Sequence, residues 1–453
     1  MNNYFEKYKK IKNKLSYQYQ GYNLGEIIAF DIIYHIYFER KNDLEDQAYR
    51  IILSQIKQHP YIDNLQDICE HPGVVFTIPK TQSRRNDYCE LIELTSQKIN
   101  KSVNFILDMK IDSKSIPLFS KSFLLFLITF LNNFIKLFKL LSIKEILMFS
   151  CRLQFYRNFI DALESIDENK VKIKKYIAFN GALNYENILV KFCQKRDIPT
   201  YSLQHAIMDR YFLNKSSPPY DLINIENLQT DYLLCWSQNT INQIRKSSMT
   251  SAELLLVGNL KYSKWKIEEI KQSFRKGLVF LGGKGDDLIN LEVIEIIKKL
   301  SKIRGDIEFY FKLHPQNLNE KYYKKITEEH SINVVQTNEI LSNLLINSDF
   351  DFTISYNTTT TVYYESLCYG LPCFRYNQEQ TVNVYGLEND DFSTVEELVQ
   401  RILYFQQIDP SMLLEKIQKM LQNTVGININ NYHQYFAEYS YNDLKVVNKN
   451  DYG

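Results

Sequence analysis

The feature that most constrains the fold is a regular alternation of short apolar segments and amphipathic segments in the second part of the chain. KKYIAFNG (174–181) is typical of a strand, ALNYENILVKFCQKRD (182–197) of a helix and IPTYSLQHA (198–206) of a second strand. A strand, a helix and a strand within about 30 residues form a βαβ unit, which requires parallel strands. Further segments of both kinds continue the pattern to residue 258.

A second series of strands and helices runs from residue 277 to residue 405, after a polar stretch at 258–276. This alternation predicts an open, doubly wound sheet. We therefore predict an α/β protein of two Rossmann-like domains, 1–260 and 261–453, which face each other across a cleft. Helical periodicity dominates the part of the chain that precedes the first of these strands, so we expect a helix-rich N-terminal domain. The sequence leaves open whether the last helices pack back on that domain.

Composition narrows the functional class. The chain has 453 residues, with 54 Lys and Arg against 53 Asp and Glu, so it lacks a basic field and we expect no nucleic-acid partner. The seven cysteines are scattered, and no histidine lies beside them at metal-ligand spacing, which indicates reduced thiols and no zinc site. The N-terminal segment lacks an apolar signal region, so we expect a cytoplasmic protein.

Residues 121–142 (KSFLLFLITFLNNFIKLFKLLS) form a long apolar stretch that polar residues interrupt. Its longest unbroken apolar run, from Phe123 to Ile128, is too short to span a membrane. The polar residues recur at helical spacing and leave a broad apolar face opposite. They are Thr129, Asn132, Asn133, Lys136 and Lys139. One interpretation is a core helix with one wet side. The other is a helix in a membrane interface, with its lysines near anionic headgroups, which would give weak peripheral membrane contact.

In open α/β sheets, ligands bind beyond the carboxyl ends of the strands, so the residues after each strand are the site candidates. The first loop of the C-terminal domain holds Gly282, Gly283 and Lys284. Glycines let backbone N–H groups approach an anion, and the next helix start favours phosphate, although a plain turn is the alternative. The second loop is His314-Pro315. Its proline ends the strand, and the imidazole can then meet a phosphate oxygen, or the dipeptide can simply end the strand.

The third loop, which precedes a helix, consists of Asn357, Thr358, Thr359 and Thr360. Hydroxyls and free N–H groups at a helix start can donate to phosphate, and simple capping is the alternative. Glu365 lies about two turns into that helix, on a face that could reach a ribose. The three loops together predict a phosphate-binding edge of the sheet.

Several segments carry a resemblance to GT-B-fold glycosyltransferases. FKLHPQ (311–316) and SDFDFTISYNTTTTVYYESLCYGLPCFRY (348–376) resemble their nucleotide-binding domain. YSLQHA, YLLCWS and LLLVGN are similar to the QHG, W-[GS] and VG-N segments of the same group. More narrowly, the chain resembles the HP-motif sialyl-, polysialyl- and Kdo-transferases of bacterial capsule and lipopolysaccharide assembly. The likeness covers roughly residues 170–380, and the order of the motifs carries more weight than any one of them.

This resemblance implies a nucleotide-sugar donor in the C-terminal domain. It places His314 and Pro315 at the donor phosphate, the threonine loop around that phosphate and Glu365 at the ribose. The chain departs from the family at the catalytic base, because the acidic D/E-D/E-G motif is replaced by Phe179-Asn180-Gly181.

The base should therefore come from other residues after the strands of the N-terminal half. Our candidates for catalytic residues are His205, Glu186 and Asp209. A histidine has an ordinary pKa suited to a general base, with a core or capping role as the alternative. Glu186 lies at a helix start, where it could equally complement the helix dipole.

No DxD motif follows a strand, and Asp349-Phe350-Asp351 leads into one, so we expect metal-independent catalysis with no cofactor. The leading hypothesis is an inverting glycosyltransferase that uses a CMP-sugar, or alternatively a UDP-sugar. Its acceptor would be an oligosaccharide or lipid-linked glycan of the bacterial surface, reached in the cytoplasm or at the inner face of the plasma membrane. The alternatives are a polyol-phosphate transferase of the CDP-glycerol type, a nucleotide-sugar 2-epimerase and an inactive GT-B accessory protein.

Overall fold

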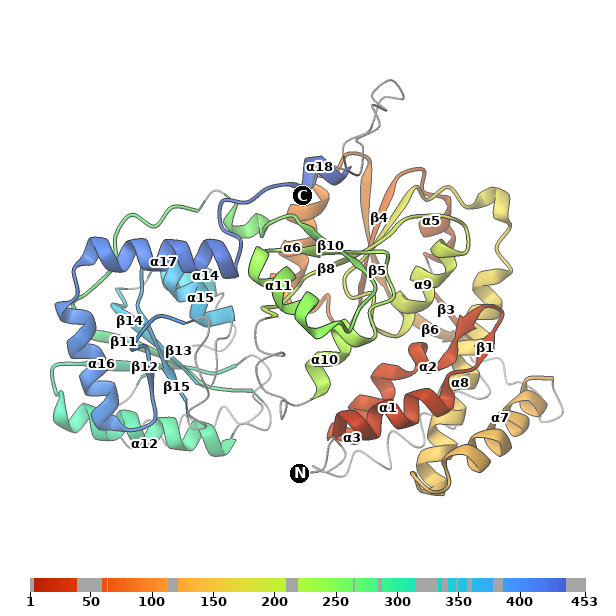
Figure 1. Cartoon of the computed structure of the whole chain (residues 1–453), viewed down its shortest axis with the longest axis horizontal. Helices are drawn as coiled ribbons and strands as arrows, with labels where there is room; N and C mark the ends of the chain where they lie inside the picture. The colour runs from red at the N-terminus through yellow and green to blue at the C-terminus, as the bar shows by residue number, and fades with distance from the viewer. Residues whose placement is uncertain are drawn as a thin grey trace.

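The computed structural model describes residues 4–38, 59–62, 64–112, 121–208, 219–263, 265–283, 287–314, 333–335, 341–347, 349–356, 361–377 and 386–436. Two six-stranded sheets dominate them, one in each half of the chain, and helices surround both sheets (Figure 1). All neighbouring strands in both sheets are parallel. The prediction of two doubly wound α/β domains is confirmed.

The first sheet has the strand order β10-β9-β8-β7-β4-β5. Its strands are β4 (Val74–Pro79), β5 (Ser102–Leu107), β7 (Lys175–Ala178), β8 (Thr200–Leu203), β9 (Tyr232–Cys235) and β10 (Glu253–Leu256). The sequence predicted the last four. It missed β4 and β5, although each has six residues, because a short apolar run such as VVFTIP cannot be distinguished from a buried helix segment by its period alone. The expectation that helices dominate the chain before β7 therefore overlooked two core strands.

The second sheet has the strand order β13-β12-β11-β14-β15-β16. Its strands are β11 (Lys276–Phe280), β12 (Glu308–Lys312), β13 (Asn333–Val335), β14 (Phe352–Tyr356), β15 (Cys373–Tyr376) and β16 (Asp391–Phe392). The sequence predicted all of them except the very short β16. The chain moves from β11 outward to β13 and then returns to the other side of β11 for β14. This reversal makes the gap between β11 and β14 the switch point of the sheet.

Helices follow the amphipathic segments, and some begin at well-formed caps. Ser142 and Glu145 form a capping box, in which each side chain bonds the other residue's backbone N–H. The N-terminal half contains α1 (Tyr4–Leu15), α2 (Leu24–Ile27), α3 (Ala29–Phe38), α5 (Leu65–Glu70), α6 (Asn86–Ser96), α7 (Lys121–Leu137), α8 (Ile143–Glu164), η2 (Glu168–Lys170), α9 (Asn184–Gln194), α10 (Pro219–Glu226), α11 (Gln238–Ser247) and η3 (Leu260–Tyr262). The C-terminal half contains α12 (Asp287–Ile303), α14 (Leu341–Asn347), α15 (Thr361–Cys368), α16 (Val395–Gln407), α17 (Pro410–Thr424) and α18 (Tyr432–Phe436).

Two short antiparallel pairs complete the N-terminal half. They are β1 (Gln18–Tyr19) with β2 (Tyr22–Asn23), and β3 (His59–Ile62) with β6 (Met109–Asp112). Neither pair joins the first sheet.

Helix α7 packs with its polar side inward. Thr129 and Asn133 are buried, and α8 supplies their partners: Arg157 donates to Thr129 Oγ1, and Asn133 Nδ2 donates to Ser150 Oγ at 3.0 Å. The interpretation of a core helix with a solvent-exposed polar side is therefore wrong for Thr129 and Asn133. Asn132 and Lys139 are exposed, as that interpretation expected, and Phe126 and Leu137 are buried beside the two inward polar residues. Among the described residues, no helix has the length and apolarity needed to cross a membrane.

The last helices contact the first sheet. Asn431 N donates to Val257 O at 3.0 Å, and the Phe436 ring lies 4.9 Å from the ring of Tyr201 on β8. Helix α18 thus lies over the N-terminal half (Figure 1). The two domain ranges stay a prediction, while these contacts show that the chain end bridges the two halves.

Gly426 lies where backbone segments of this bridge approach most closely. Its φ is +75°, and a Cβ there would lie 1.9 Å from Trp236 O. We predict that Gly426→Ala lowers the free energy of unfolding by about 2–4 kcal/mol in urea denaturation. The new side chain would strain the backbone at its positive φ, and its Cβ would also collide with Trp236 O. Gly305→Ala is the control, since its Cβ would meet only Ser301 O at 4.0 Å, and it should change stability by less than about 0.5 kcal/mol. Two equally stable variants would contradict this account.

Candidate functional site

The carboxyl ends of β11 and β12 bring two of the candidate loops together. The strands pair with Phe280 beside Lys312, and Leu281 N donates to Lys312 O at 3.0 Å. Slightly further on, Gly283 lies against His314, because a Cβ at Gly283 would be 3.1 Å from the imidazole Nδ1. The glycine loop and the histidine are therefore side by side, and phosphate binding by them stays a prediction.

Asn290, in the first turn of α12, fixes the glycine loop. Its Oδ1 accepts from Gly282 N at 2.6 Å, and its Nδ2 donates to Gly282 O at 3.3 Å. The amide is fully buried, so this clamp holds the end of β11 in one conformation. Sequence reasoning missed Asn290. The signal was present, since it is the one polar residue in a helical stripe with Val293, Ile294 and Ile297.

Several candidates lie outside the described residues: Asp209, Lys284, Pro315, Asn357, Thr358, Thr359 and Thr360. The threonine loop nevertheless has a defined attachment, because it joins β14 to α15. β14 pairs directly with β11, with Val279 beside Ile354. The loop therefore starts at the switch point of the second sheet, next to the strand that carries the glycine loop.

Glu365 is part of an ion-pair group that links the two halves. Its carboxylate lies 2.7 Å from Lys261 Nζ, and Glu90 of α6 lies 3.7 Å from the same ammonium. Burial alone would lower the pKa of Lys261, but the two carboxylates raise it overall. The predicted ribose contact of Glu365 would require a substrate hydroxyl to share this carboxylate with Lys261.

Glu186, a candidate catalytic residue, is fully buried behind β7. Its Oε1 accepts from Thr77 Oγ1 at 2.7 Å and from Phe179 N at 2.8 Å, and its Oε2 accepts from Asn180 N at 2.9 Å. Burial raises the pKa of Glu186 to about 7, although these hydrogen bonds act in the opposite sense. The geometry makes Glu186 a positioning residue for the loop after β7, with no exposed oxygen for a substrate.

His205 follows β8 and lies partly buried in an aromatic stack. Its ring centroid is 4.7 Å from that of Phe179 and 5.9 Å from that of Tyr88, and the Arg85 guanidinium lies 3.9 Å from the Tyr88 ring. Burial lowers the pKa of His205 to about 4, and Arg85 acts in the same sense, against a hydrogen bond to Leu203 O. The imidazole is therefore neutral at pH 7 and can accept a proton, but a pKa of about 4 makes it a weaker base than the ordinary histidine that the sequence predicted.

Sequence reasoning missed the residues that the loop after β4 adds to this stack. Arg85 and Tyr88 belong to that loop and to the start of α6, and β4 was not expected to be a strand. β4 pairs with β5 on one side and with β7 on the other, so the first sheet has its switch point here. The stack thus lies at the carboxyl ends of the strands and beside the switch point, which is where open α/β sheets bind ligands.

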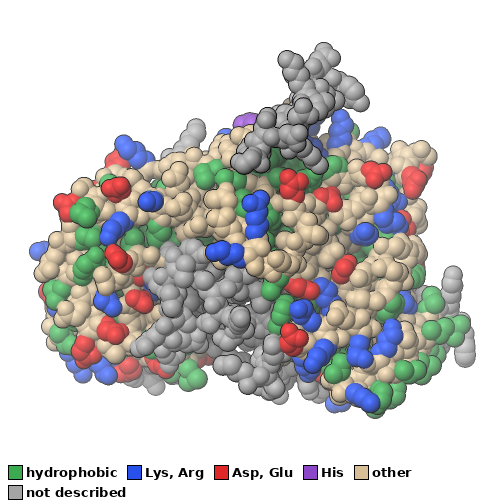
Figure 2. All heavy atoms as spheres, viewed as in Figure 1, with side chains coloured by type: hydrophobic (Ala, Val, Ile, Leu, Met, Phe, Trp, Pro, Cys, Tyr) green, Lys and Arg blue, Asp and Glu red, His purple; other side chains and the backbone are tan. Residues whose placement is uncertain are grey.

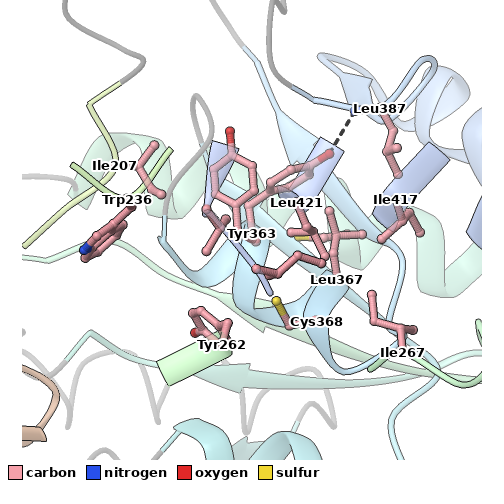
Figure 3. Packing of buried hydrophobic residues seen from close by; sticks show 14 of the residues in the cluster. Ile207, Trp236, Tyr262, Ile267, Tyr363, Leu367, Cys368, Leu387, Ile417 and Leu421 are labelled. Carbon is pink, nitrogen blue, oxygen red and sulfur yellow. Dashed lines mark hydrogen bonds between the residues drawn. The ribbon is translucent and has the colours of Figure 1, made fainter. Parts of the chain in front are cut away.

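Residues from both sheets meet in one apolar cluster. Ile207, just beyond His205, and Trp236, directly after β9, belong to the same cluster as Tyr363 and Leu367 of α15 (Figure 3). Helix α15 begins where the threonine loop ends. The carboxyl side of the first sheet therefore packs toward α15, the helix that follows the threonine loop of the second sheet.

The residues of the DxD pattern lie at the opposite edge of the second sheet. Asp351 accepts from Arg275 N at 2.7 Å and from Lys276 N at 3.0 Å, which caps the amino end of β11. The described residues contain no group of three or more His, Cys, Asp or Glu side chains able to hold a metal ion. Asp351 is therefore structural, and metal-independent catalysis stays a prediction.

A surface hollow in the first half of the chain also lies away from the candidate site. It has a volume of about 540 Å³, with Pro199 and Asp231 in its wall. These residues precede β8 and β9, so the hollow is at the amino ends of strands whose carboxyl ends carry His205 and Trp236.

No protein-family model matches the chain, and no curated protein matches it in sequence. Among solved structures, it is similar to the UDP-GlcNAc 2-epimerase of Neisseria meningitidis bound to UDP-GlcNAc, with 16% identity and a TM-score of 0.42 over 81% of this chain and 98% of that one. It is also similar to S. aureus MnaA with UDP (10% identity, TM-score 0.45, 80% and 93%). For S. aureus TarM, the match spans 56% of that chain and 60% of this one, with 10% identity and a TM-score of 0.39. At these scores, the fold assignment rests on the strand order of the two sheets.

The depressed pKa of His205 predicts a pH dependence of stability. The unfolded chain binds a proton there near pH 6.5, and the folded chain only near pH 4. Between these values the unfolded state holds more protons, so the free energy of unfolding should fall by about 2 kcal/mol as the pH drops from 6.5 to 4. His205→Phe should flatten this slope in urea denaturation, whereas the exposed His433→Phe should keep it. An unchanged slope in His205→Phe would contradict the buried, neutral imidazole.

Proposed function

We propose that the chain is a GT-B glycosyltransferase that binds a nucleotide-sugar donor in its C-terminal half and the acceptor in its N-terminal half. The observation that carries the proposal is the contact of Gly283 with His314 beside the switch point of a doubly wound sheet. Backbone N–H groups, an imidazole and the start of α12 are all suited to a phosphate group. The resemblance of the HP segment favours a CMP-sugar, with a UDP-sugar as the alternative.

In this proposal the reaction inverts the anomeric centre in one displacement. His205 takes the proton from the acceptor hydroxyl, whose oxygen attacks the anomeric carbon as the bond to the nucleotide phosphate breaks. His314 donates to the phosphate oxygen that gains charge, so no metal or cofactor is required. The remaining donor contacts come from the glycine and threonine loops and from the ribose-facing Glu365. The glycine loop includes Gly282 and Lys284, the threonine loop includes Asn357, Thr358, Thr359 and Thr360, and Pro315 belongs to the loop that carries His314.

The carboxylates of the N-terminal half support transfer over epimerisation. An epimerase needs several acid–base groups around one sugar, but Glu186 is enclosed. Asp87 pairs with Arg85 at 2.6 Å, and Asp108 pairs with Lys80 at 2.6 Å. Among the described residues at the carboxyl ends of this sheet, His205 is thus the group best suited to a single proton transfer.

We propose a glycan of the bacterial surface as the acceptor, either an oligosaccharide or a lipid-linked saccharide. A lipid-linked acceptor would bring the enzyme to the inner face of the plasma membrane as a peripheral protein. The enzyme would otherwise work in the cytoplasm.

A donor panel tests the reaction class. We expect nucleotide release with acceptor present from one of the CMP-, UDP-, GDP- or CDP-activated donors, and undiminished release in EDTA. Formation of a 2-epimer without an acceptor would identify an epimerase, and transfer from CDP-glycerol a polyol-phosphate transferase. Activity lost in EDTA and restored by Mg²⁺ or Mn²⁺ would contradict the metal-independent mechanism.

The contribution of His314 can be measured by substitution. His314→Ala should lower kcat/KM by about 100-fold or more while the melting temperature stays within a few degrees, because a donor to developing charge is lost. His71→Ala is the matched control, since His71 also precedes a proline but lies before β4, at the amino edge of the first sheet. Near-normal turnover in His314→Ala would reject the proposed role.

A further inference from the structure

The outer surface of α7 is unusually apolar. Of the fifteen exposed large apolar side chains in the described residues, eight lie between positions 124 and 143. We name these eight the α7 face: Leu124, Leu127, Ile128, Leu131, Phe134, Ile135, Phe138 and Ile143. Leu131 is 59% exposed and Ile135 is 71% exposed, so the face is in full contact with solvent. A continuous apolar strip of this kind marks a surface that another phase or molecule covers.

The polar packing of α7 fixes this orientation. Thr129 and Asn133 are engaged by Arg157 and Ser150 inside the N-terminal half, and Lys136 lies 5.1 Å from the Tyr17 ring centroid. Rolling the helix over would leave the Arg157 guanidinium without Thr129 and would place leucines against it. Exposure of the apolar side is therefore built into the packing of α7 on α8.

The charges within residues 121–144 are of one sign, and lysines outnumber the one exposed acidic residue, Glu6, on the adjacent helix α1. Residues 121–144 contain four lysines and no Asp or Glu, and Lys139 and Lys144 are exposed. Helix α1, which packs beside α7, exposes Lys7, Lys10 and Lys14. Figure 2 shows basic side chains gathered beside apolar ones at this end of the molecule. The lysines that surround the α7 face are therefore complementary to an anionic surface.

We propose that the α7 face docks the protein on a lipid bilayer that carries anionic headgroups. The apolar strip would enter the boundary between headgroups and acyl chains, with the lysines of α1 and of residues 136–144 at the headgroup level. A second copy of the chain fits less well, because pairing two such faces would bring two lysine rims together. Docking can be measured without substrate, so failure of this inference and failure of the proposed transfer reaction are distinguishable.

Sedimentation with liposomes tests the proposal on the full chain. We expect the protein to sediment at low salt with vesicles of phosphatidylcholine and phosphatidylglycerol in a molar ratio of about 7:3, and less in pure phosphatidylcholine or at high salt. Leu131→Glu with Ile135→Glu should weaken partitioning at least about tenfold. Lys139→Gln and Lys144→Gln should each weaken it by about fivefold. These side chains are exposed, so circular dichroism and melting temperature should stay close to those of the wild type.

The matched control is Leu288→Glu with Ile303→Glu on α12, which adds the same charges at two exposed apolar positions of the other domain. The control should sediment like the wild type. Equal loss in the control would show that net charge alone governs binding and would overturn the role of the α7 face. So would a wild type that ignores all vesicles, or a dimer in light scattering that Leu131→Glu with Ile135→Glu dissociates.

Discussion

The parallel pairing of β11 with both β12 and β14 is the constraint on which the part of the candidate site in the C-terminal half depends. The carboxyl ends of parallel strands lie at one edge of the sheet. Strand pairing therefore makes neighbours of residues that are distant in the chain. Gly283 meets His314 because their strands share a register. Asn290 then uses the first turn of α12 to hold the glycine loop by both of its backbone groups. The site is therefore shaped by the sheet before any ligand arrives.

The first sheet uses the same geometry with different chemistry. Its switch point lies between β4 and β7, and a buried carboxylate connects the two strands, since Glu186 accepts from Thr77 within β4 and from Phe179 directly after β7. Phe179 in turn packs against His205. Burial that would be unfavourable for a charged histidine keeps this one neutral. In the proposed function, the first sheet would supply the acid–base group and the second sheet the phosphate contacts of a transfer between two bound substrates.

The sequence predicted the parallel strands from β7 to β15 because each has a helix or turn of distinct periodicity on either side. It could not reveal β4 or β5, and so it missed Arg85 and Tyr88. Nor could it distinguish a carboxylate that faces a substrate from one that is enclosed: Glu186 has a helix-start position in either case. Strand ends could be found by pattern, but the direction of a side chain and its partners depend on residues far away in the chain.

Helix α7 is a simple case in which the sequence pattern does not determine the direction of the side chains. An amphipathic pattern defines two faces but does not say which one turns inward, and here the choice depends on Ser150 and Arg157 of the next helix. Polar partners inside the N-terminal half outweigh the usual tendency to bury leucines. The second sheet lies at the other end of the molecule from α7 (Figure 1). A bilayer contact at α7 would therefore hold the N-terminal half, which we propose to bind the acceptor, against the lipid. It would leave the C-terminal half, which we propose to bind the nucleotide sugar, open to solution.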